Sequence, residues 1–587
     1  MRKYSKLRVT IQQLSVAAVT VIMAYSVVHA QTPAPALPPL SVTKAQHFQN
    51  NPTAWNTFLT QLPRRPSGSP QLTPRTMQPA FGGSWTAVNA APAGLCNPLL
   101  LTDGTVMAAN CNTPSWYRLT PDITGSYANG SWRQIASLPV INGTQYAPQY
   151  YASAVLPDGR VLIMGGEYNG SNTEVWTNLG AIYDPVANTW TAVSPPAGSS
   201  WTQIGDAQSV VLANGTFMLA SCCAKPDVDA LFNAGTLTWT STGAPSAGGA
   251  YQDEQGYELL PNGNVLTIDI WTDYPAGNAT NAEQYVPSSG TWTSAGNTPV
   301  PLADPYQCGN WEIGPAVMRP DGTMVAFGGN TGCTASPPIS PVDPTAIYNS
   351  TSGVWTAGPY IPFVCGTGGT TSCTLADAPA ALLPDGNILF AASAGFAAPP
   401  THFFEFSSTD AINQVADPIY NAGTEGSYEY NFLVLPSGQI FTTDLSNTAE
   451  VYSPTGSAAS GVAPSVSTAP SVVAPGATYS LSGFQFNGLS QGAYYGDDVQ
   501  GATNYPLVRI VNNATGHVFY ARTFGHSTMS VAPNAAGSTN FTVPNPIESG
   551  ASQLFVVANG VASQPENITI KPNNAFISPI ISYLLNN

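Results

Sequence analysis

Residues 150–170, YYASAVLPDGRVLIMGGEYNG, hold the pattern that decides the fold of this chain. Two apolar segments flank Asp158-Gly159, and the second of them ends in Gly165-Gly166. An Asp-Gly pair between alternating apolar runs predicts a β-hairpin with a two-residue type I′ turn, in which both turn residues have positive φ. We therefore expect a strand, a tight turn and a second strand in this stretch.

The same hairpin pattern recurs along most of the chain. The seven turn pairs are Asp103-Gly104, Asp158-Gly159, Asn214-Gly215, Asn262-Gly263, Asp321-Gly322, Asp385-Gly386 and Ser437-Gly438. Subtraction of successive first residues gives spacings of 55, 56, 48, 59, 64 and 52. A repeat of about fifty residues with one hairpin per unit is typical of propeller blades. The sequence thus predicts an all-β fold with a seven-bladed propeller over residues 81–460.

A tryptophan accompanies most of the hairpins. These residues are Trp85, Trp132, Trp190, Trp239, Trp292 and Trp355. Trp85 precedes the first hairpin, whereas no comparable tryptophan follows the seventh. We therefore predict that the segment around Trp85 completes the seventh blade. Such closure joins the two ends of the ring and removes exposed sheet edges.

The remaining segments indicate an exported protein with a second domain. Residues 1–30 have a basic start, an apolar run and a small-x-small end, which is typical of a secretory signal peptide. Residues 31–80 form a Pro-rich linker and a short N-terminal segment. Short predicted strands over 464–572 indicate an Ig-like sandwich. The apolar tail 573–587 is too short to span a membrane. We expect a secreted, periplasmic or cell-surface protein without a membrane span after signal cleavage.

The composition narrows the class of partner. Only 8% of the 587 residues are charged, while Gly numbers 54 and Pro 53, as in turn-rich β proteins. The formal net charge is −16. Nucleic acid is not an expected partner, because no basic patch is present to neutralise phosphates. Cations and neutral sugars suit such a chain better.

Eight cysteines in an exported chain predict disulfides. Cys96 and Cys111 are symmetric about Asp103-Gly104, so in a two-residue hairpin they face each other directly. The adjacent Cys222 and Cys223 indicate a rigid patch near a binding surface. The four predicted bridges are Cys96–Cys111, Cys222–Cys223, Cys308–Cys333 and Cys365–Cys373.

Alignment of the seven hairpins on their turns predicts an acidic ring. The residue seven positions before the one that precedes each turn pair is, in order, Leu95, Tyr150, Asp206, Glu254, Ile313, Asp377 and Glu429. The first strand of each blade lines the central channel, so these equivalent positions lie around one channel mouth. Glu312 and Asp253 stand next to the ring. The candidate binding residues are Asp206, Glu254, Glu312, Asp377 and Glu429.

Carboxylates brought together in this way need compensation. They can share protons, accept backbone N–H hydrogen bonds or bind a cation. A purely structural role, in which each carboxylate caps the backbone of a neighbouring blade, is one interpretation. The other is a cation site or a sugar-binding funnel. Oxygen ligands alone favour a hard cation such as Ca²⁺ over copper or zinc.

The tyrosine, tryptophan and diglycine positions after each hairpin resemble kelch repeats. A secreted kelch propeller followed by an Ig-like domain resembles galactose oxidase and glyoxal oxidase, the copper-radical oxidases. That resemblance implies a copper site made by a cysteine cross-linked to a tyrosine, a second tyrosine and two histidines. The matching positions in this chain are Cys96, Tyr150 or Tyr151, Tyr428 and His526.

Two departures weaken this match. Glu429 stands beside Tyr428 where the family has a histidine, so a metal site here would use His526, Tyr428 and Glu429. A carboxylate is a poor replacement for imidazole at Cu(II). A Cys96–Cys111 disulfide would also prevent the thioether.

Three hypotheses about function follow. The first is a divergent propeller that binds a glycan or a cation at its acidic channel mouth. The second is a copper-radical oxidase of a small primary alcohol or aldehyde that produces hydrogen peroxide, with Tyr428 as proton acceptor and the cross-linked tyrosine as radical. The third is a structural surface protein without an active site.

Overall fold

The computed structural model describes residues 82–572 except 225–226, 246–251, 271–279, 304–311, 330–342, 366–372, 396–397 and 497–499. The predicted signal peptide, nearly all of the linker segment and the apolar tail lie outside the described residues, as do Cys308 and Cys333. The described part is all-β apart from two short 3₁₀ turns, Ser199–Trp201 and Ser427–Glu429. No helix among these residues is long and apolar enough to cross a membrane.

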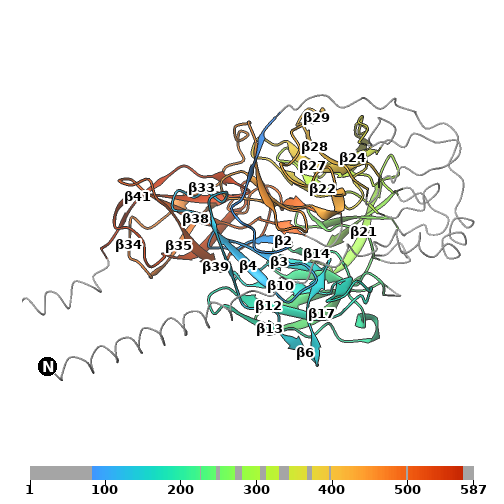
Figure 1. Cartoon of the computed structure of the whole chain (residues 1–587), viewed down its shortest axis with the longest axis horizontal. Coiled ribbons are helices and arrows are strands. Elements are labelled where there is room, and N and C mark those ends of the chain that lie inside the picture. The colour runs from blue at the N-terminus through green and yellow to red at the C-terminus, as the bar shows by residue number, and fades with distance from the viewer. Residues whose placement is uncertain are drawn as a thin grey trace, which may run out of the picture. The chain divides into compact units, whose positions relative to one another are not determined.

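Seven antiparallel sheets form the blades of a β-propeller, as predicted (Figure 1). The first blade contains β2 (Leu95–Leu100), β3 (Val106–Asn110), β4 (Trp116–Thr120) and β5 (Ser131–Gln134). The second contains β9 (Ala152–Val155), β10 (Val161–Met164), β12 (Gly180–Asp184) and β13 (Thr189–Ala192). The third contains β14 (Ser209–Val211), β15 (Phe217–Ala220), β16 (Asp229–Asn233) and β17 (Thr238–Thr242).

The other four blades repeat this four-strand order. The fourth contains β18 (Glu258–Leu259), β19 (Val265–Asp269), β20 (Asn281–Val286) and β21 (Thr291–Asn297). The fifth contains β22 (Ala316–Met318), β23 (Thr323–Phe327), β24 (Thr345–Asn349) and β25 (Val354–Ala357). The sixth contains β26 (Ala380–Leu382), β27 (Ile388–Ser393), β28 (Thr401–Phe406) and β29 (Ile412–Gln414). The seventh contains β30 (Asn431–Val434), β31 (Ile440–Thr443), β32 (Ala449–Ser453) and β1 (Ser84–Ala87).

The first strands of the blades contact one another in a closed cycle, β2, β9, β14, β18, β22, β26, β30 and back to β2. The ring closes through β1, which pairs with β32 so that Trp85 lies opposite Tyr452. This confirms that the segment around Trp85 completes the seventh blade. The N-terminal strand β1 thus becomes the outermost strand of the last blade, directly before the first blade in the chain, and this closes the ring.

The repeated tryptophans tie neighbouring blades together. All six lie on the outermost strand of their blade, and in five of them the indole N–H donates to a backbone carbonyl of the preceding blade or of the chain just after it. The bonds are Trp190 to Ala136 (2.9 Å), Trp239 to Ser194 (2.8 Å), Trp292 to Gly243 (2.9 Å), Trp355 to Ala295 (3.2 Å) and Trp85 to Ala416 (2.6 Å). A buried or half-buried indole needs such an acceptor. The repeat therefore encodes contacts between blades as well as the blades themselves.

The hairpin turns differ from the prediction of two-residue type I′ turns. In the second blade the Leu156 amide bonds to the Arg160 carbonyl, so the loop holds three residues. The other six hairpins have the same bond, and only their glycines have positive φ, from +75° to +90°. The Asp158 carboxylate accepts a hydrogen bond from the Arg160 amide at 3.0 Å, which stabilises a type I turn followed by a left-handed glycine.

The C-terminal part of the chain contributes two strands to the propeller. Strand β36 (Gly492–Tyr494) pairs with β26 of the sixth blade, and β37 (Gly501–Ala502) pairs with β36. Strand β36 also contacts β22 and β30, whereas β37 contacts β2, β9 and β30. All of these are first strands of their blades. Strand β37 and the segment Gly492–Gly496, which holds β36 and is named the channel segment, therefore lie in the central channel.

The remaining C-terminal strands form a nine-stranded sheet. They are β33 (Ser465–Thr468), β34 (Val472–Val473), β35 (Thr478–Phe484), β38 (Leu507–Asn512), β39 (Val518–Phe524), β40 (Ala536–Thr542), β41 (Gly550–Ala558), β42 (Val561–Ala562) and β43 (Glu566–Ile570). Strand β39 pairs with β38 along its first half and with β40 along its second. Leu481 and Phe541 on one side share a core with Ile510 and Val556 on the other. The Ig-like sandwich expected over 464–572 stays a prediction.

Candidate functional site at the acidic mouth of the channel

The start of each first strand defines one mouth of the channel. The hairpin turns lie at the opposite ends of these strands, because every turn follows its first strand along the chain. The predicted ring positions therefore share one end of the propeller. At this mouth the structure brings together the carboxylates of adjacent blades.

Two overlapping carboxylate groups occupy the mouth. Glu254, Glu312 and Asp377, from the fourth, fifth and sixth blades, offer oxygen atoms that all lie within 4.8 Å of one another. Asp206, Asp253 and Glu254 form a second group at the same spacing. In the fifth blade the ligand oxygen comes from Glu312 and not from the aligned Ile313, which is apolar and 3% exposed. The acidic ring that the hairpin alignment predicts is thus present over four blades.

The backbone at the ring is unusual. Tyr150, Glu254 and Asp377 occupy equivalent positions in the second, fourth and sixth blades, and their φ values are +51°, +55° and +49°. A residue with a side chain pays on the order of 1–2 kcal/mol in this left-handed region. The surrounding structure therefore holds these three side chains in fixed directions.

Tyr428 and Glu429 continue the mouth in the seventh blade. They lie in the 3₁₀ turn Ser427–Glu429, and the Tyr428 hydroxyl donates to Glu429 Oε1 at 3.1 Å. Burial raises the pKa of Glu429 to about 7. Burial, and then the charge of Glu429, raise the pKa of Tyr428 far above its usual value, with Asp377 contributing in the same direction. Tyr428 therefore keeps its proton at neutral pH.

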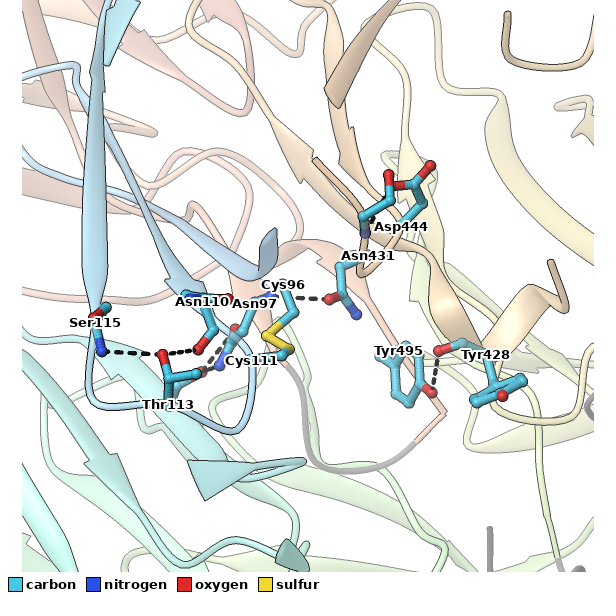
Figure 2. Close-up of a disulfide and its surroundings, with 12 residues drawn as sticks. Cys96, Asn97, Asn110, Cys111, Thr113, Ser115, Tyr428, Asn431, Asp444 and Tyr495 are labelled. Atoms are coloured by element: carbon cyan, nitrogen blue, oxygen red, sulfur yellow. Dashed lines mark hydrogen bonds between the residues drawn. A yellow bond between two sulfur atoms is a disulfide. The ribbon is translucent and has the colours of Figure 1, made fainter. Parts of the chain in front are cut away.

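The channel segment brings a further tyrosine to this place. The Tyr495 hydroxyl donates to the backbone carbonyl of Tyr428 at 2.7 Å, as Figure 2 shows. Tyr428 and Tyr495 form a small apolar cluster against which Tyr150 packs. Gly496 follows at once, and a Cβ built on it would lie 3.0 Å from Asp377 Oδ1. The tip of the channel segment therefore touches both the tyrosines and the carboxylates.

Sequence reasoning missed Tyr495. One signal for it was present in the sequence, which predicts strands at 479–484 and 506–512 with more than twenty residues between them. Connections of that length without structure of their own are uncommon in a compact domain and are often functional. Of the two tyrosines considered in the second blade, Tyr150 joins this site. Tyr151 is fully buried beside Trp116, with ring centroids 6.5 Å apart.

His526 is not part of this site. Its backbone amide donates to the Pro157 carbonyl at 3.2 Å, and its Nδ1 lies 2.9 Å from Thr539 Oγ1. Pro157 is in the turn of the second hairpin, whereas Tyr150 lies before β9 at the other end. The six residues between them include strand β9, so the two lie roughly 20 Å apart. The predicted metal set of His526, Tyr428 and Glu429 is therefore not brought together, because the channel segment and not the His526 loop reaches the mouth.

Cys96 is bonded to Cys111, as predicted, with the two Cα atoms 5.7 Å apart (Figure 2). The two residues are not directly opposite, however. Because the turn holds three residues and a bulge follows, Cys96 pairs with Ala109. The bridges Cys222–Cys223 and Cys365–Cys373 are also present. The predicted Cys308–Cys333 bridge lies outside the described residues.

The donors at the mouth do not fit a copper-radical site. Cys96 is held in a disulfide and is not available for a thioether to a tyrosine. The three histidines of the described residues bond elsewhere: His402 to Asp417, His517 to Glu548 and His526 to Thr539.

The chain was compared with protein families, curated proteins and solved structures. No protein-family model matches the chain, and no curated protein matches it. Among solved structures the chain is similar to a novel fungal alcohol oxidase of the AA5 family in complex with copper, with 13% identity and a TM-score of 0.45, over 84% of this chain and 100% of the oxidase. The AA5 oxidases belong to the galactose oxidase family, to which the predicted resemblance points.

A second similar structure is the extracellular domain of a putative hybrid two component system from B. thetaiotaomicron. The identity is 10% and the TM-score 0.39, over 84% of this chain and 60% of that one. Both TM-scores are below 0.5, so neither likeness carries an argument about the site. The fold and the mouth define this protein as a seven-bladed propeller whose channel opens between carboxylates and tyrosines.

Proposed function

We propose that this protein is a binding module that holds a hard divalent cation, foremost Ca²⁺, at the acidic mouth of its propeller. The observation that carries the proposal is the meeting of Glu254, Glu312 and Asp377 from three successive blades, with ligand oxygens within 4.8 Å of one another. Calcium binds oxygen ligands at about 2.3–2.6 Å, so two oxygens on one ion lie at most about 5 Å apart. The spacing at the mouth meets this limit.

Electrostatics supports an occupant. Two carboxylates 4–5 Å apart repel each other by on the order of 3–4 kcal/mol at an effective dielectric constant of about 20. Glu254 and Glu312 are 5% and 3% exposed, so water screens them little. A bound cation would offset this repulsion while both carboxylates stay ionised. Protonation would also relieve it, but it would neutralise one of the carboxylates.

A second observation points to a missing partner at the same mouth. Glu429 is 3% exposed, and its Oε2 atom has no hydrogen-bond partner among the described residues. A buried carboxylate oxygen without a partner costs on the order of 1–3 kcal/mol or more. Its Oε1 atom is held by Tyr428, whose pKa also responds to Asp377. Glu429 therefore extends the acidic ring into the seventh blade.

A glycan is the second candidate ligand. Tyr150, Tyr428 and Tyr495 gather beside the carboxylates, and aromatic faces next to hydrogen-bond acceptors suit sugar rings. A small alcohol or aldehyde as an oxidase substrate receives no such support, since the copper donors do not fit. We also propose that the protein is exported to the periplasm, the cell surface or the medium, because the disulfides present are stable in an oxidising compartment.

Calorimetric titration tests the proposal. The purified protein, stripped with EGTA, is titrated with CaCl₂, MgCl₂ and CuSO₄, and its melting temperature is followed in parallel. We expect Ca²⁺ to bind and to raise Tm, by mass action on the folded state. The double variant Glu254→Gln/Glu312→Gln should lose at least about tenfold in affinity. Glu548→Gln, a surface carboxylate that bonds His517, is the matched control and should bind as the parent does.

Three results would change the assignment. Absence of Ca²⁺ and Mg²⁺ binding would overturn the cation site. Tight Cu²⁺ binding with peroxide release from alcohols would favour the oxidase hypothesis. A glycan array probed with and without Ca²⁺ separates a sugar ligand that needs the cation from one that binds the tyrosines alone.

A further inference from the structure

The vicinal disulfide Cys222–Cys223 adjoins the acidic mouth. Its sulfur atoms and an oxygen of Asp253 lie within 4.8 Å of one another. The same Asp253 belongs to the group with Asp206 and Glu254. Asp253 therefore lies between the disulfide and the carboxylates of Asp206 and Glu254.

Backbone hydrogen bonds of Cys222 hold both loops that carry these carboxylates. The Cys222 amide donates to the Ile204 carbonyl at 3.1 Å, two residues before Asp206. The Cys222 carbonyl accepts from the Gln252 amide, also at 3.1 Å and two residues before Glu254. One residue thus bridges the entry to β14 in the third blade and the approach to β18 in the fourth.

Side-chain packing strengthens this bridge. A Cβ built on Gly205 would lie 2.5 Å from Cys222 Sγ, so the sulfur is seated directly against the backbone beside Asp206. Gly205 has φ of +66°, which favours glycine, and a Cβ there would also lie 2.9 Å from the Trp176 ring, so no larger residue fits at this position. Cys222 is fully buried, whereas Cys223 is half-buried and can be reached from solvent.

We infer that the vicinal disulfide positions the Asp206 and Glu254 loops at cation-binding spacing, and that the cation affinity of the mouth depends on whether Cys222–Cys223 is oxidised or reduced. This inference rests on the proposed function. Cys222 acts through the two loops and binds no cation itself in the oxidised state. It is a positioning residue.

The chemical step is thiol–disulfide exchange with a dithiol reductant. The thiolate of the reductant attacks the accessible Cys223 sulfur, the bond between Cys222 and Cys223 breaks, and Cys222 leaves as a thiolate that takes up a proton. The second thiol of the reductant then displaces Cys223. The products are the cyclic disulfide of the reductant and two protein thiols, so two electrons pass from reductant to protein. The covalent ring that holds the turn at Cys222 is then open.

The experiment compares Ca²⁺ affinity in three forms of the full protein. These are the parent, measured oxidised as purified and again after reoxidation, the parent reduced with dithiothreitol, and the variant Cys222→Ala/Cys223→Ala. The variant Cys96→Ala/Cys111→Ala is the control, because its disulfide lies in the first blade, which contributes no carboxylate to the ring. Mass spectrometry counts the thiols at each stage, and Tm in EGTA reports the fold without cation.

We expect reduction and the Cys222→Ala/Cys223→Ala change to weaken Ca²⁺ binding about tenfold, the usual size of an indirect effect on metal affinity. Reoxidation should restore the parent value, and the control should bind as the parent does. If the oxidised parent binds Ca²⁺ and the reduced form and the variant bind it equally well, the inference is wrong while the proposed function stands. If the oxidised parent binds no Ca²⁺, both are wrong. A variant that fails to fold leaves the reversible reduction of the parent as the deciding measurement.

Discussion

The hydroxyl of Tyr495 donates a hydrogen bond to the backbone carbonyl of Tyr428 at 2.7 Å, which joins the channel segment to the seventh blade. Both residues are at most 5% exposed, so water cannot replace this bond. We predict that Tyr495→Phe lowers the free energy of unfolding by about 1–2 kcal/mol, because it leaves the Tyr428 carbonyl unsatisfied. Urea unfolding measures the change. Tyr420→Phe, at an exposed tyrosine, is the control, and an equal effect of both substitutions would contradict the prediction.

Gly496 lies at the point where the channel segment meets the acidic ring. A Cβ there would be 2.8 Å from the Ile313 carbonyl and 3.0 Å from Asp377 Oδ1. We predict that Gly496→Ala lowers the free energy of unfolding by about 1–3 kcal/mol, the usual cost of overpacking, and weakens Ca²⁺ binding. Gly423→Ala is the matched control, because no atom lies within 4 Å of a Cβ at that position. Thermal unfolding and calorimetry measure both effects, and a parent-like Gly496→Ala protein would refute the prediction.

Buried carboxyls predict a fall in stability as the pH rises. Asp229 accepts hydrogen bonds from the Tyr257 hydroxyl and the Trp292 indole, and burial raises its pKa to about 8 from an ordinary 3.8. Between these values the folded state holds a proton that the unfolded state has lost. The contribution of Asp229 to the free energy of unfolding is therefore fully present below pH 4. It falls by up to about 1.4 kcal/mol per pH unit as the pH rises, and it no longer changes above pH 8. Glu429, with a raised pKa of about 7, acts in the same direction.

The variant Asp229→Asn tests this account. The amide stays neutral, so the decline between pH 5 and pH 8 should become shallower in urea unfolding with EGTA present. Stability at pH 5 should fall by about 1 kcal/mol, because the amide cannot accept both hydrogen bonds. A parent-like slope in the variant would show that Asp229 does not titrate in this range.

The indole hydrogen bonds between blades predict that Trp→Phe substitutions at different blades lower the free energy of unfolding by different amounts. Trp292 is 5% exposed and donates to both the Gly243 carbonyl and Asp229 Oδ2. Trp355 is half-buried and donates to the Ala295 carbonyl. Both changes to Phe remove similar ring area and one bond to a backbone carbonyl, but Trp292→Phe also removes a hydrogen bond to the buried Asp229 carboxyl. We expect it to cost about 1–2 kcal/mol more than Trp355→Phe in chemical denaturation. Equal costs would mean that the indole N–H of Trp292 contributes no stability.

The local sequence pattern was sufficient to predict the seven blades and most residues of the acidic ring. Hairpin spacing predicts the seven sheets, and alignment on the turns predicts Asp206, Glu254, Asp377 and Glu429 at one mouth. The turn type was wrong, because the Asp158 side chain competes for the Arg160 amide and favours a three-residue loop. That extra residue, with the bulge that follows in the first blade, moves Cys96 away from a position directly opposite Cys111.

The sequence pattern did not predict which C-terminal loop reaches the channel mouth. His526 is the histidine of the C-terminal part that matched the family position, yet its loop packs against Pro157 at the turn end of the second blade. The segment that enters the channel is Gly492–Gly496, and it brings Tyr495. Which loop reaches the mouth depends on how β36 pairs with β26, more than a hundred residues earlier in the chain.

The amino-acid sequence by itself determined the all-β class, the seven blades, their closure through Trp85 and the position of the acidic ring, because these depend on short repeats whose alternation and turns act locally. Only the tertiary structure decided that Glu254, Glu312 and Asp377 meet, that Tyr495 joins Tyr428, and that Cys222 bridges two carboxylate loops. These contacts join different blades or the C-terminal segment, and their distances follow from packing around the channel.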